Sequence, residues 1–233
     1  MSVFIEAVIF DWDATLADTH KIIVSAFQQA LKTIDITNIS DAYIERCIGI
    51  GAAKTFREIL QTANLPVNEL IIKDLVERKS QNQIDLKNSV QLFCGVTNFL
   101  ELLQGKVKVG LASMNNKAVI DTLIHAKGIE KYFQAIITAD DVKLSKPDPE
   151  IFLKCAQQLN VEPSKCIVIE DSLFGVKAAK AVGMSCIAIT TGSYSRDELE
   201  QAKPDVIVTN MEQAKIYLFN NTNLERPIEG NVW

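Results

Sequence analysis

Short, largely apolar runs recur along the chain, and most of them lack the strict alternation of a half-exposed strand. Runs of this length and composition are typical of strands that are buried on both faces. Six of them stand out: Val3–Phe10, Val107–Ala112, Ala135–Thr138, Cys166–Ile169, Ser185–Ile189 and Val206–Val208. They predict the strands of a central sheet.

Helical periodicity lies between the later runs. The apolar residues of Asn116–Ala126 share one face, and Leu173–Val182 ends at Gly183, a natural helix stop. A further helix is expected from Asp148, as its N-cap, with Pro149 at its first position. The alternation of strands and helices predicts an α/β fold with a doubly wound parallel sheet.

The stretch from residue 17 to residue 90 departs from this alternation. It contains successive helical patterns and no strand run: Ile22–Leu31, Asp41–Cys47, Lys54–Thr62 and Asn68–Arg78. We therefore expect an α/β core formed by residues 1–16 and 91–233, and an all-α cap domain formed by residues 17–90. Ligands of such sheets bind beyond the carboxyl ends of the strands, so an insert after the first strand would cover the site as a lid.

Charge and hydropathy exclude several classes of protein. The 233 residues include 24 Lys and Arg against 29 Asp and Glu, which gives a formal charge of −5 and argues against nucleic acid as a partner. No apolar run approaches the roughly 18–20 residues that span a bilayer, and the N-terminus lacks the basic start of a signal peptide. We expect no membrane partner.

The five cysteines include no CxxC pair, and Cys155, Cys166 and Cys186 lie in apolar patterns. Buried, reduced thiols in a cytoplasmic protein are the expectation. The sequence leaves the oligomeric state open, with a monomer favoured. The tail Asn220–Trp233 has no core pattern.

Two pairs of acidic residues directly follow apolar runs. Asp11 and Asp13 come after the first run, and Glu170 and Asp171 come after Cys166–Ile169. Either pair alone is compatible with a helix cap or a solvated loop. Because parallel strands bring their carboxyl ends to one edge, the four carboxylates should converge and require a cation. Ligation by oxygen alone points to Mg²⁺ rather than Zn²⁺.

Polar residues also follow the two runs between these acids. Ser113 comes after Val107–Ala112, and its hydroxyl, with the backbone N–H groups of Met114 and Asn115, can donate to a phosphate. Lys146 follows the run that begins at Ala135, so its ammonium could pair with the carboxylates and hold an anionic substrate oxygen. Taken singly, a helix cap and a solvated lysine explain these residues equally well.

In chain order the predicted strands end in Asp-x-Asp, Ser, Lys and Glu-Asp, and this set resembles the haloacid dehalogenase superfamily. The four motifs of that family are matched by Asp11–Leu16, Ser113, Lys146-Pro147 and Glu170–Gly175. The resemblance covers nearly the whole chain. The helical insert is similar to the cap of the subgroup that holds β-phosphoglucomutase and phosphoglycolate phosphatase.

The resemblance implies a role for each matched residue. Asp11 would be the nucleophile that accepts the phosphoryl group, and Asp13 the general acid and base. Ser113 and Lys146 would hold the phosphoryl oxygens. The substrate would be a small phosphorylated molecule. Because the Asp11 carboxylate repels a phosphate dianion, its attack requires cations that offset the charge, namely Mg²⁺ and Lys146.

The resemblance also implies a Mg²⁺ site. Asp171 would bind the ion together with Asp11 and the backbone carbonyl of Asp13, and Glu170 would assist. One residue departs from the family pattern, since Ala14 stands where glycine is usual. We expect alanine to be tolerated there at negative φ.

The choice between hydrolase and mutase depends on the residues that match the cap. Lys79 is similar to the cap lysine of a sugar-phosphate mutase, although an exposed place on a cap helix is an equal alternative. The mutase histidine and the cap arginine, however, fall at Ile23 and near Ala52, and Thr15 is typical of phosphatases. The similarity therefore favours a phosphatase acting on a sugar phosphate or a phosphoglycolate-like metabolite, with a mutase as the alternative.

A phospho-accepting switch protein is the remaining alternative. Response-regulator receivers share Asp, Ser or Thr, and Lys on a similar sheet. They are shorter, carry no helical insert, and place the acceptor aspartate on the third strand, whereas this chain has both Asp11 and Asp13 on the first.

Overall fold

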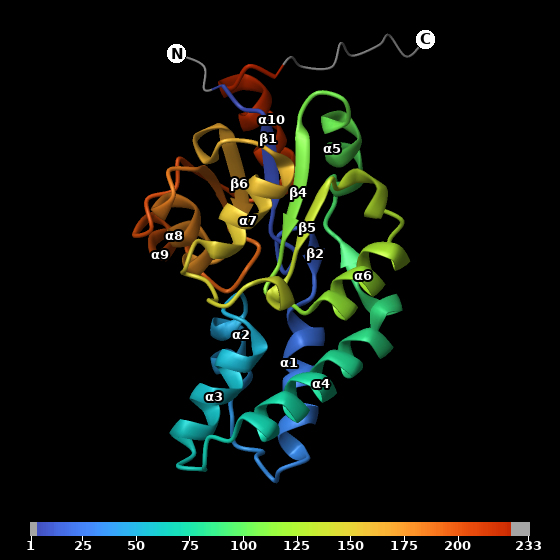
Figure 1. Cartoon of the computed structure of the whole chain (residues 1–233), viewed down its shortest axis with the longest axis vertical. Helices are drawn as coiled ribbons and strands as arrows, with labels where there is room; N and C mark the ends of the chain where they lie inside the picture. Colours follow the sequence, from blue (N-terminus) through green and yellow to red (C-terminus); the bar gives the residue numbers. More distant parts are fainter. Residues whose placement is uncertain (1–3, 225–233) are drawn as a thin grey trace.

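The computed structural model describes residues 4–224, and its centre is a six-stranded sheet with the strand order β5-β4-β1-β6-β7-β8 (Figure 1). Every neighbouring pair is parallel. The strands are β1 (Ala7–Phe10), β4 (Lys108–Ala112), β5 (Ala135–Ile137), β6 (Cys166–Glu170), β7 (Ser185–Ile189) and β8 (Val206–Val208). The predicted α/β fold is confirmed, and each predicted run corresponds to one strand, with β6 extending one residue past its run to Glu170. The first run begins at Val3, outside the described residues.

Helices cover both faces of the sheet. One face packs against α5 (Val96–Leu103), α6 (Lys117–Ala126) and α10 (Met211–Asn221), and the other against α7 (Glu150–Leu159), α8 (Leu173–Ala181) and α9 (Arg196–Glu200). Alternate residues of β1 point to opposite faces, with Val8 and Phe10 in one core and Ala7 and Ile9 in the other. The described residues also include four short 3₁₀ turns: Lys87–Ser89, Glu130–Tyr132, Ala139–Asp141 and Pro163–Lys165.

The start of α7 differs from the prediction. The helix begins at Glu150, and Pro149 is its N-cap residue rather than its first helical residue. Asp148 is therefore not the N-cap. Its carboxylate instead accepts a hydrogen bond of 2.9 Å from the Glu150 backbone N–H, a local turn that competes with the helical cap.

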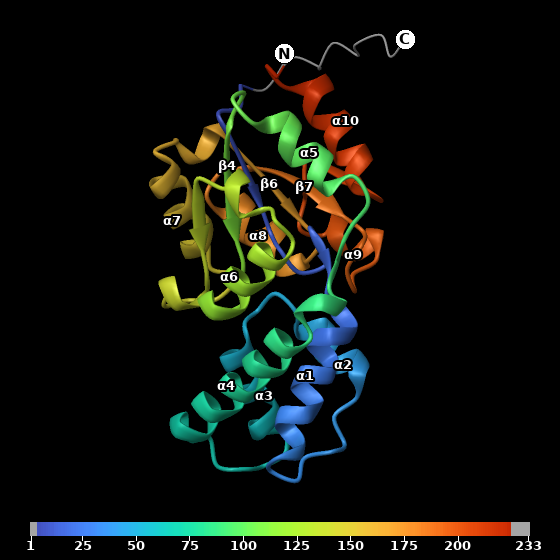
Figure 2. The same cartoon turned by 90° about the vertical axis from the view of Figure 1, so that its right-hand side faces the viewer.

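Four helices within residues 20–85 form a bundle at one end of the sheet, as Figures 1 and 2 show. They are α1 (His20–Lys32), α2 (Asp41–Cys47), α3 (Ala52–Thr62) and α4 (Glu69–Asp85). The bundle has its own apolar cluster, which includes Phe27, Phe56 and Ile59. The division into a cap of residues 17–90 and a core of the remainder stays a prediction.

The expectation that residues 17–90 contain no strand was wrong. Ala17–Asp18 forms β2, which pairs antiparallel with β3 (Gln91–Leu92) where the chain enters and leaves the bundle. Two-residue strands leave no periodicity in a sequence, so the pattern of apolar residues could not reveal this ribbon.

Ala14 does not meet the condition of a negative φ under which alanine was expected to be tolerated. Its φ is +54°, in the left-handed region. The turn holds Ala14 there, because its N–H donates to the Ala17 carbonyl at 2.8 Å and its own carbonyl accepts from the Thr191 hydroxyl. Relative to glycine, alanine in this conformation costs about 1 kcal/mol.

The thiols behave as the sequence predicted. Cys155, Cys166 and Cys186 are buried, and all five cysteines are free. Between residues 4 and 224, no helix combines the length and the apolar character that crossing a bilayer requires.

Candidate active site

Three carboxylates meet where β1 and β6 end side by side. Asp11 follows β1, Glu170 ends β6, and Asp171 comes next. Oxygen atoms of the three side chains lie within 4.8 Å of one another. The residues are only 4%, 0% and 5% exposed, so their charges are almost fully desolvated.

Lys146 brings a buried positive charge to this cluster. Its Nζ lies 2.6 Å from Asp11 Oδ1 and 2.7 Å from Glu170 Oε1, and it also donates to the Ala112 carbonyl at 3.3 Å. Burial alone would lower the pKa of Lys146, but Asp11 and Glu170 hold it above its ordinary value. The side chain therefore remains an ammonium.

One ammonium does not balance three carboxylates. Burial raises the pKa of Asp11 and of Asp171 well above the ordinary value, with the neighbouring carboxylates adding to the rise and Lys146 opposing it. Within the described residues, Asp171 has a single side-chain partner, the Thr15 hydroxyl at 3.4 Å. A buried donor set made only of oxygen, with negative charge in excess, fits a hard divalent cation such as Mg²⁺.

Glu170 is held at both of its oxygens. Oε1 accepts from Lys146, and Oε2 accepts from the backbone N–H and the hydroxyl of Ser172 at 2.6 and 2.9 Å. This arrangement makes Glu170 an anchor for Lys146 and leaves Asp11 and Asp171 better placed to face a cation.

Two glycines make room for the acidic cluster. A Cβ built on Gly175 would overlap the Glu170 carboxylate, and one built on Gly192 would overlap the carboxylate of Asp171. Gly192, in the loop that follows β7, was not predicted from the sequence. Its position after a buried run at the same sheet edge is the only sequence signal that could have identified it.

Asp13 lies apart from the three clustered carboxylates and is held by neutral donors. The Thr19 hydroxyl donates to its Oδ1 at 2.8 Å, and Asn115 Nδ2 donates to its Oδ2 at 2.6 Å. Burial raises the pKa of Asp13, and Lys79, more than Thr19, opposes that rise. Thr19 was not predicted from the sequence, because its place beside Asp13 follows only from the folded turn after β1.

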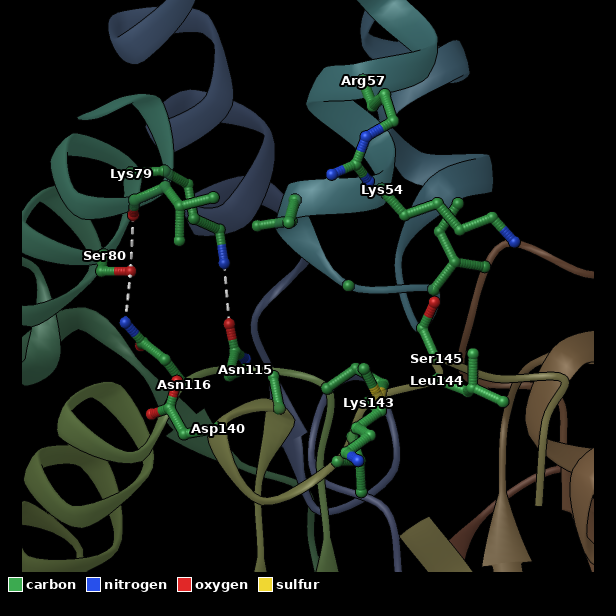
Figure 3. A pocket seen from close by; sticks show the side chains of 18 residues that line it. Lys54, Arg57, Lys79, Ser80, Asn115, Asn116, Asp140, Lys143, Leu144 and Ser145 are labelled. Carbon is green, nitrogen blue, oxygen red and sulfur yellow. Dashed lines mark hydrogen bonds between the residues drawn. The ribbon is translucent and has the colours of Figure 1, made fainter. Parts of the chain in front are cut away.

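Lys79 reaches this group from the cap. Its Nζ donates to Asn115 Oδ1 at 2.7 Å (Figure 3). Because Asn115 also donates to Asp13, it links Lys79 to that carboxylate. Lys79 is only 4% exposed, which excludes an exposed place on a cap helix. Burial lowers the pKa of Lys79 to about 8, against the attraction of Asp13.

The predicted phosphate-binding residues lie at the same edge. Ser113 is fully buried after β4, and its Oγ accepts from the Asn115 backbone N–H at 3.2 Å. Met114 packs beneath the cap, where a Cβ on Gly51 would come 3.1 Å from Met114 Cε. The structure therefore brings all the predicted site residues together, with the Asn115 side chain occupied by Asp13 and Lys79.

The helical bundle contacts the rest of the chain on two sides of the site. On one side Asn116 Nδ2 donates to the Ser80 hydroxyl at 2.9 Å, next to the Lys79 bond (Figure 3). On the other, Arg46 pairs with Glu198 at 2.7 Å, and the Tyr194 hydroxyl donates to the Arg46 carbonyl at 2.8 Å.

Comparison with known proteins gives consistent results. The model of the family described as haloacid dehalogenase-like hydrolase matches residues 8–189. A phosphorylated carbohydrates phosphatase of Thermotoga maritima is 32% identical over 78% of this chain and 83% of its own length. The fructose-1-phosphate phosphatase YqaB of Escherichia coli is 29% identical over 78% of this chain and 94% of its own length.

A solved structure also superposes closely. The beta-phosphoglucomutase of Clostridium difficile gives a TM-score of 0.82 at 27% identity, covering 93% of this chain and 96% of that one. The family match confirms the resemblance that the four motifs predicted.

Replacing Lys146 by methionine should destabilise the protein in a pH-dependent manner. The change leaves Asp11 and Glu170 buried without their counter-charge, a loss of about 3–5 kcal/mol at pH 8. The pKa of Asp11 is raised in the folded state, so that state binds protons more readily than the unfolded chain. Stability lost at high pH should therefore return as the pH falls.

Urea unfolding at pH 8 and pH 5.5 in metal-free buffer measures the free energy of unfolding of the variant and of the unaltered protein. Lys131→Met, which removes a solvent-exposed lysine outside the helical bundle, is the control. An equal loss at both pH values for Lys146→Met would contradict the electrostatic explanation.

Proposed function

The chain belongs to the haloacid dehalogenase-like hydrolases, and we propose that it is a Mg²⁺-dependent phosphatase that cleaves a small phosphate monoester through an aspartyl-phosphate on Asp11. The observation that carries this proposal is the buried Lys146 ammonium bridging Asp11 and Glu170 beside the Asp171 carboxylate. A nucleophilic carboxylate needs cations beside it to approach a phosphate dianion.

The residues at the strand ends would bind the metal ion and the phosphoryl group. Asp11, Asp171 and the backbone carbonyl of Asp13 would hold Mg²⁺, and Glu170 would assist by keeping Lys146 in position. When bound, the ion offsets the charge of the transferring phosphoryl group and polarises its oxygens. Lys146, the Ser113 hydroxyl and the backbone N–H of Met114 would hold phosphoryl oxygens.

The proposed reaction has two steps, transfer of the phosphoryl group to Asp11 and hydrolysis of the aspartyl-phosphate. An Asp11 oxygen attacks phosphorus, the bond from phosphorus to the leaving oxygen breaks, and Asp13 gives that oxygen its proton. Asp13 then takes a proton from a water that attacks the phosphorus of the aspartyl-phosphate. Free phosphate forms and Asp11 returns to its carboxylate.

Asp13 must be protonated in the first step and unprotonated in the second. Its buried position favours the neutral acid, whereas the hydrogen bonds from Thr19 and Asn115 favour the carboxylate. This balance is suited to a group that alternates between acid and base.

The substrate class follows from the relatives and from the closed cap. The two phosphatases compared above act, by their names, on fructose 1-phosphate and on phosphorylated carbohydrates. We propose a sugar phosphate or a phosphoglycolate-like metabolite, which enters when the cap of residues 17–90 opens. A cytoplasmic location, with neither nucleic acid nor membrane as a partner, completes the proposal.

A sugar-phosphate mutase is the second candidate. The buried Lys79 at the junction of cap and core favours it, as does the likeness to the C. difficile mutase. Incubation with β-glucose 1-phosphate and a bisphosphate primer separates the two, because a mutase forms an isomer without free phosphate. Membership in the hydrolase family argues against a phospho-accepting switch.

Phosphate release from p-nitrophenyl phosphate and a panel of phosphorylated metabolites is the primary test. We expect turnover with Mg²⁺, loss in EDTA, and recovery when Mg²⁺ is added in excess. Asp11→Asn removes the nucleophile and should lower kcat by about 10³-fold or more. Asp18→Asn, a nearby exposed aspartate, is the matched control. Turnover that is unchanged in Asp11→Asn would overturn the mechanism.

Asn115→Ala should impair the acid step selectively. The change removes the donor to Asp13 Oδ2 and its link to Lys79. An alkyl phosphate has a basic leaving oxygen that needs the proton of Asp13, whereas p-nitrophenolate leaves without one. The kcat/KM for an alkyl phosphate should therefore fall about 10²-fold, and that for p-nitrophenyl phosphate much less.

Asn116→Ala is the control for this selectivity. It also removes a hydrogen bond between cap and core, but Asn116 does not contact Asp13. Equal losses for the two substrates in Asn115→Ala would show that Asn115 only supports the fold.

Gly192→Ala should weaken the response to Mg²⁺. The added Cβ would displace the Asp171 carboxylate from the acidic cluster. We expect the Mg²⁺ concentration for half-maximal activity to rise about tenfold or more, in line with the effect of changing residues that orient metal ligands. Titration of activity with Mg²⁺ measures this shift, and a curve identical to that of the unaltered protein would contradict it.

A further inference from the structure

The loop of residues 190–195, between β7 and α9, contacts two parts of the candidate site within consecutive residues. The Thr191 hydroxyl donates to the carbonyl of Ala14, in the turn that follows β1. The next residue, Gly192, lies so close to Asp171 that a Cβ there would overlap the carboxylate. The position of this loop therefore bears directly on the acidic cluster.

The same loop is bound to the C-terminal end of α2. The Ser193 hydroxyl donates to the Glu45 carbonyl at 3.3 Å, and the Ser193 carbonyl accepts from Arg46 Nη1 at 3.3 Å. The Tyr194 hydroxyl donates to the Arg46 carbonyl at 2.8 Å. Figure 2 shows α2 directly below α9, which follows the loop. Donors thus lie on both sides of this junction.

The Arg46 side chain makes three of the contacts at this junction. Besides the bond to Ser193, its Cζ lies 4.1 Å from the centroid of the Tyr194 ring, a cation–π contact, and its Nη2 lies 2.7 Å from Glu198 Oε1. Glu198 is in the first turn of α9, where it forms a capping box with Ser195. We call the group of Arg46, Ser193, Tyr194 and Glu198 the latch.

The end of α2 also approaches Asp171 from a second side. A Cβ built on Gly49, two residues beyond the helix, would lie 3.2 Å from the Ser172 hydroxyl oxygen. Ser172 is the residue that follows Asp171 in the chain. The helical bundle therefore reaches both sides of this carboxylate, at Ser172 and through the loop that contains Gly192.

The Asp171 carboxylate depends on such packing for its position. Within residues 4–224, its one side-chain hydrogen bond comes from the Thr15 hydroxyl at a long 3.4 Å, whereas Glu170 is held at both of its oxygens. A carboxylate with a single weak hydrogen bond is oriented mainly by the atoms packed against it. Gly192 is one of the residues that supply those atoms.

We propose that the latch couples the position of the helical bundle to the position of Asp171, and so sets the affinity for Mg²⁺ without contacting the ion. This inference rests on the metal site of the proposed function and deepens it by naming a means of regulation. The latch residues are positioning residues, which act on a metal ligand through Gly192 and Ser172.

The coupling acts in both directions. If the latched bundle increases the affinity for Mg²⁺ by some factor, bound Mg²⁺ must favour the latched bundle by the same factor. The metal-loaded protein should therefore hold α2 against the loop of residues 190–195 more firmly than the metal-free protein does.

Isothermal titration calorimetry of the metal-free protein with Mg²⁺, in the absence of substrate, tests the first direction. We expect the Kd for Mg²⁺ to rise about fivefold or more in Arg46→Gln and in Glu198→Gln, in line with typical coupling between sites. The double variant should add little to either single change, because both remove the same ion pair.

Arg78→Gln is the matched control. It also removes an exposed guanidinium of the bundle, but this one pairs with Asp74 of the same helix at 2.6 Å. The Kd for Mg²⁺ should keep its original value in this variant. An exposed ion pair contributes little to stability, so all three single variants should fold.

Hydrogen exchange of the backbone amides of α2, with and without Mg²⁺, tests the reciprocal direction. Saturating Mg²⁺ should slow this exchange in the unaltered protein and in Arg78→Gln. The slowing should be much smaller in Arg46→Gln. A latch that only supports the fold would change the exchange rates equally with and without the ion.

The outcomes distinguish this inference from the proposed function. A Kd for Mg²⁺ that is unchanged in both latch variants overturns the coupling and leaves the phosphatase proposal standing. A raised Kd in a protein that releases no phosphate from any ester supports the coupling and overturns the catalytic proposal. Absence of Mg²⁺ binding by the unaltered protein overturns the metal site, and the coupling with it.

Discussion

Desolvated negative charge at the carboxyl ends of β1 and β6 is the constraint on which the rest of the site depends. Asp11, Glu170 and Asp171 lose nearly all contact with water, and burial of an isolated carboxylate is too costly to persist without compensation. The surroundings of the three acids follow from this requirement. Lys146 is fully buried because it supplies the counter-charge, and Gly192 has no side chain because a Cβ would overlap Asp171.

Asp13 is a further carboxylate that is shielded from water, here beneath the helical bundle. Two contacts offset the loss of water. The Thr19 hydroxyl, just before α1, donates to Asp13, and Asn115 donates to it while accepting from Lys79. Burial lowers the pKa of Lys79 to about 8, so the closed state gives up part of its stability to hold an ammonium out of water. On the proposed function, closure would be tied to the protonation state of Asp13, and opening would relieve both desolvation penalties.

Sequence reasoning succeeded where chemistry is tied to backbone topology. Apolar runs mark strands, and parallel strands bring the residues after them to one edge, so Asp11, Lys146 and Asp171 could be placed together without a structure. It failed where the outcome depends on packing between distant segments. The close approach of Gly192 to Asp171 and the positive φ of Ala14 leave no local pattern.

The excess of negative charge at the strand ends makes substrate binding conditional on a cation. Three carboxylates, those of Asp11, Glu170 and Asp171, share the single ammonium of Lys146. On the proposed function, these carboxylates repel the phosphoryl group of the substrate until a divalent cation offsets their charge. The same buried charge that requires compensation in the free protein therefore makes productive binding of an anionic substrate depend on the metal.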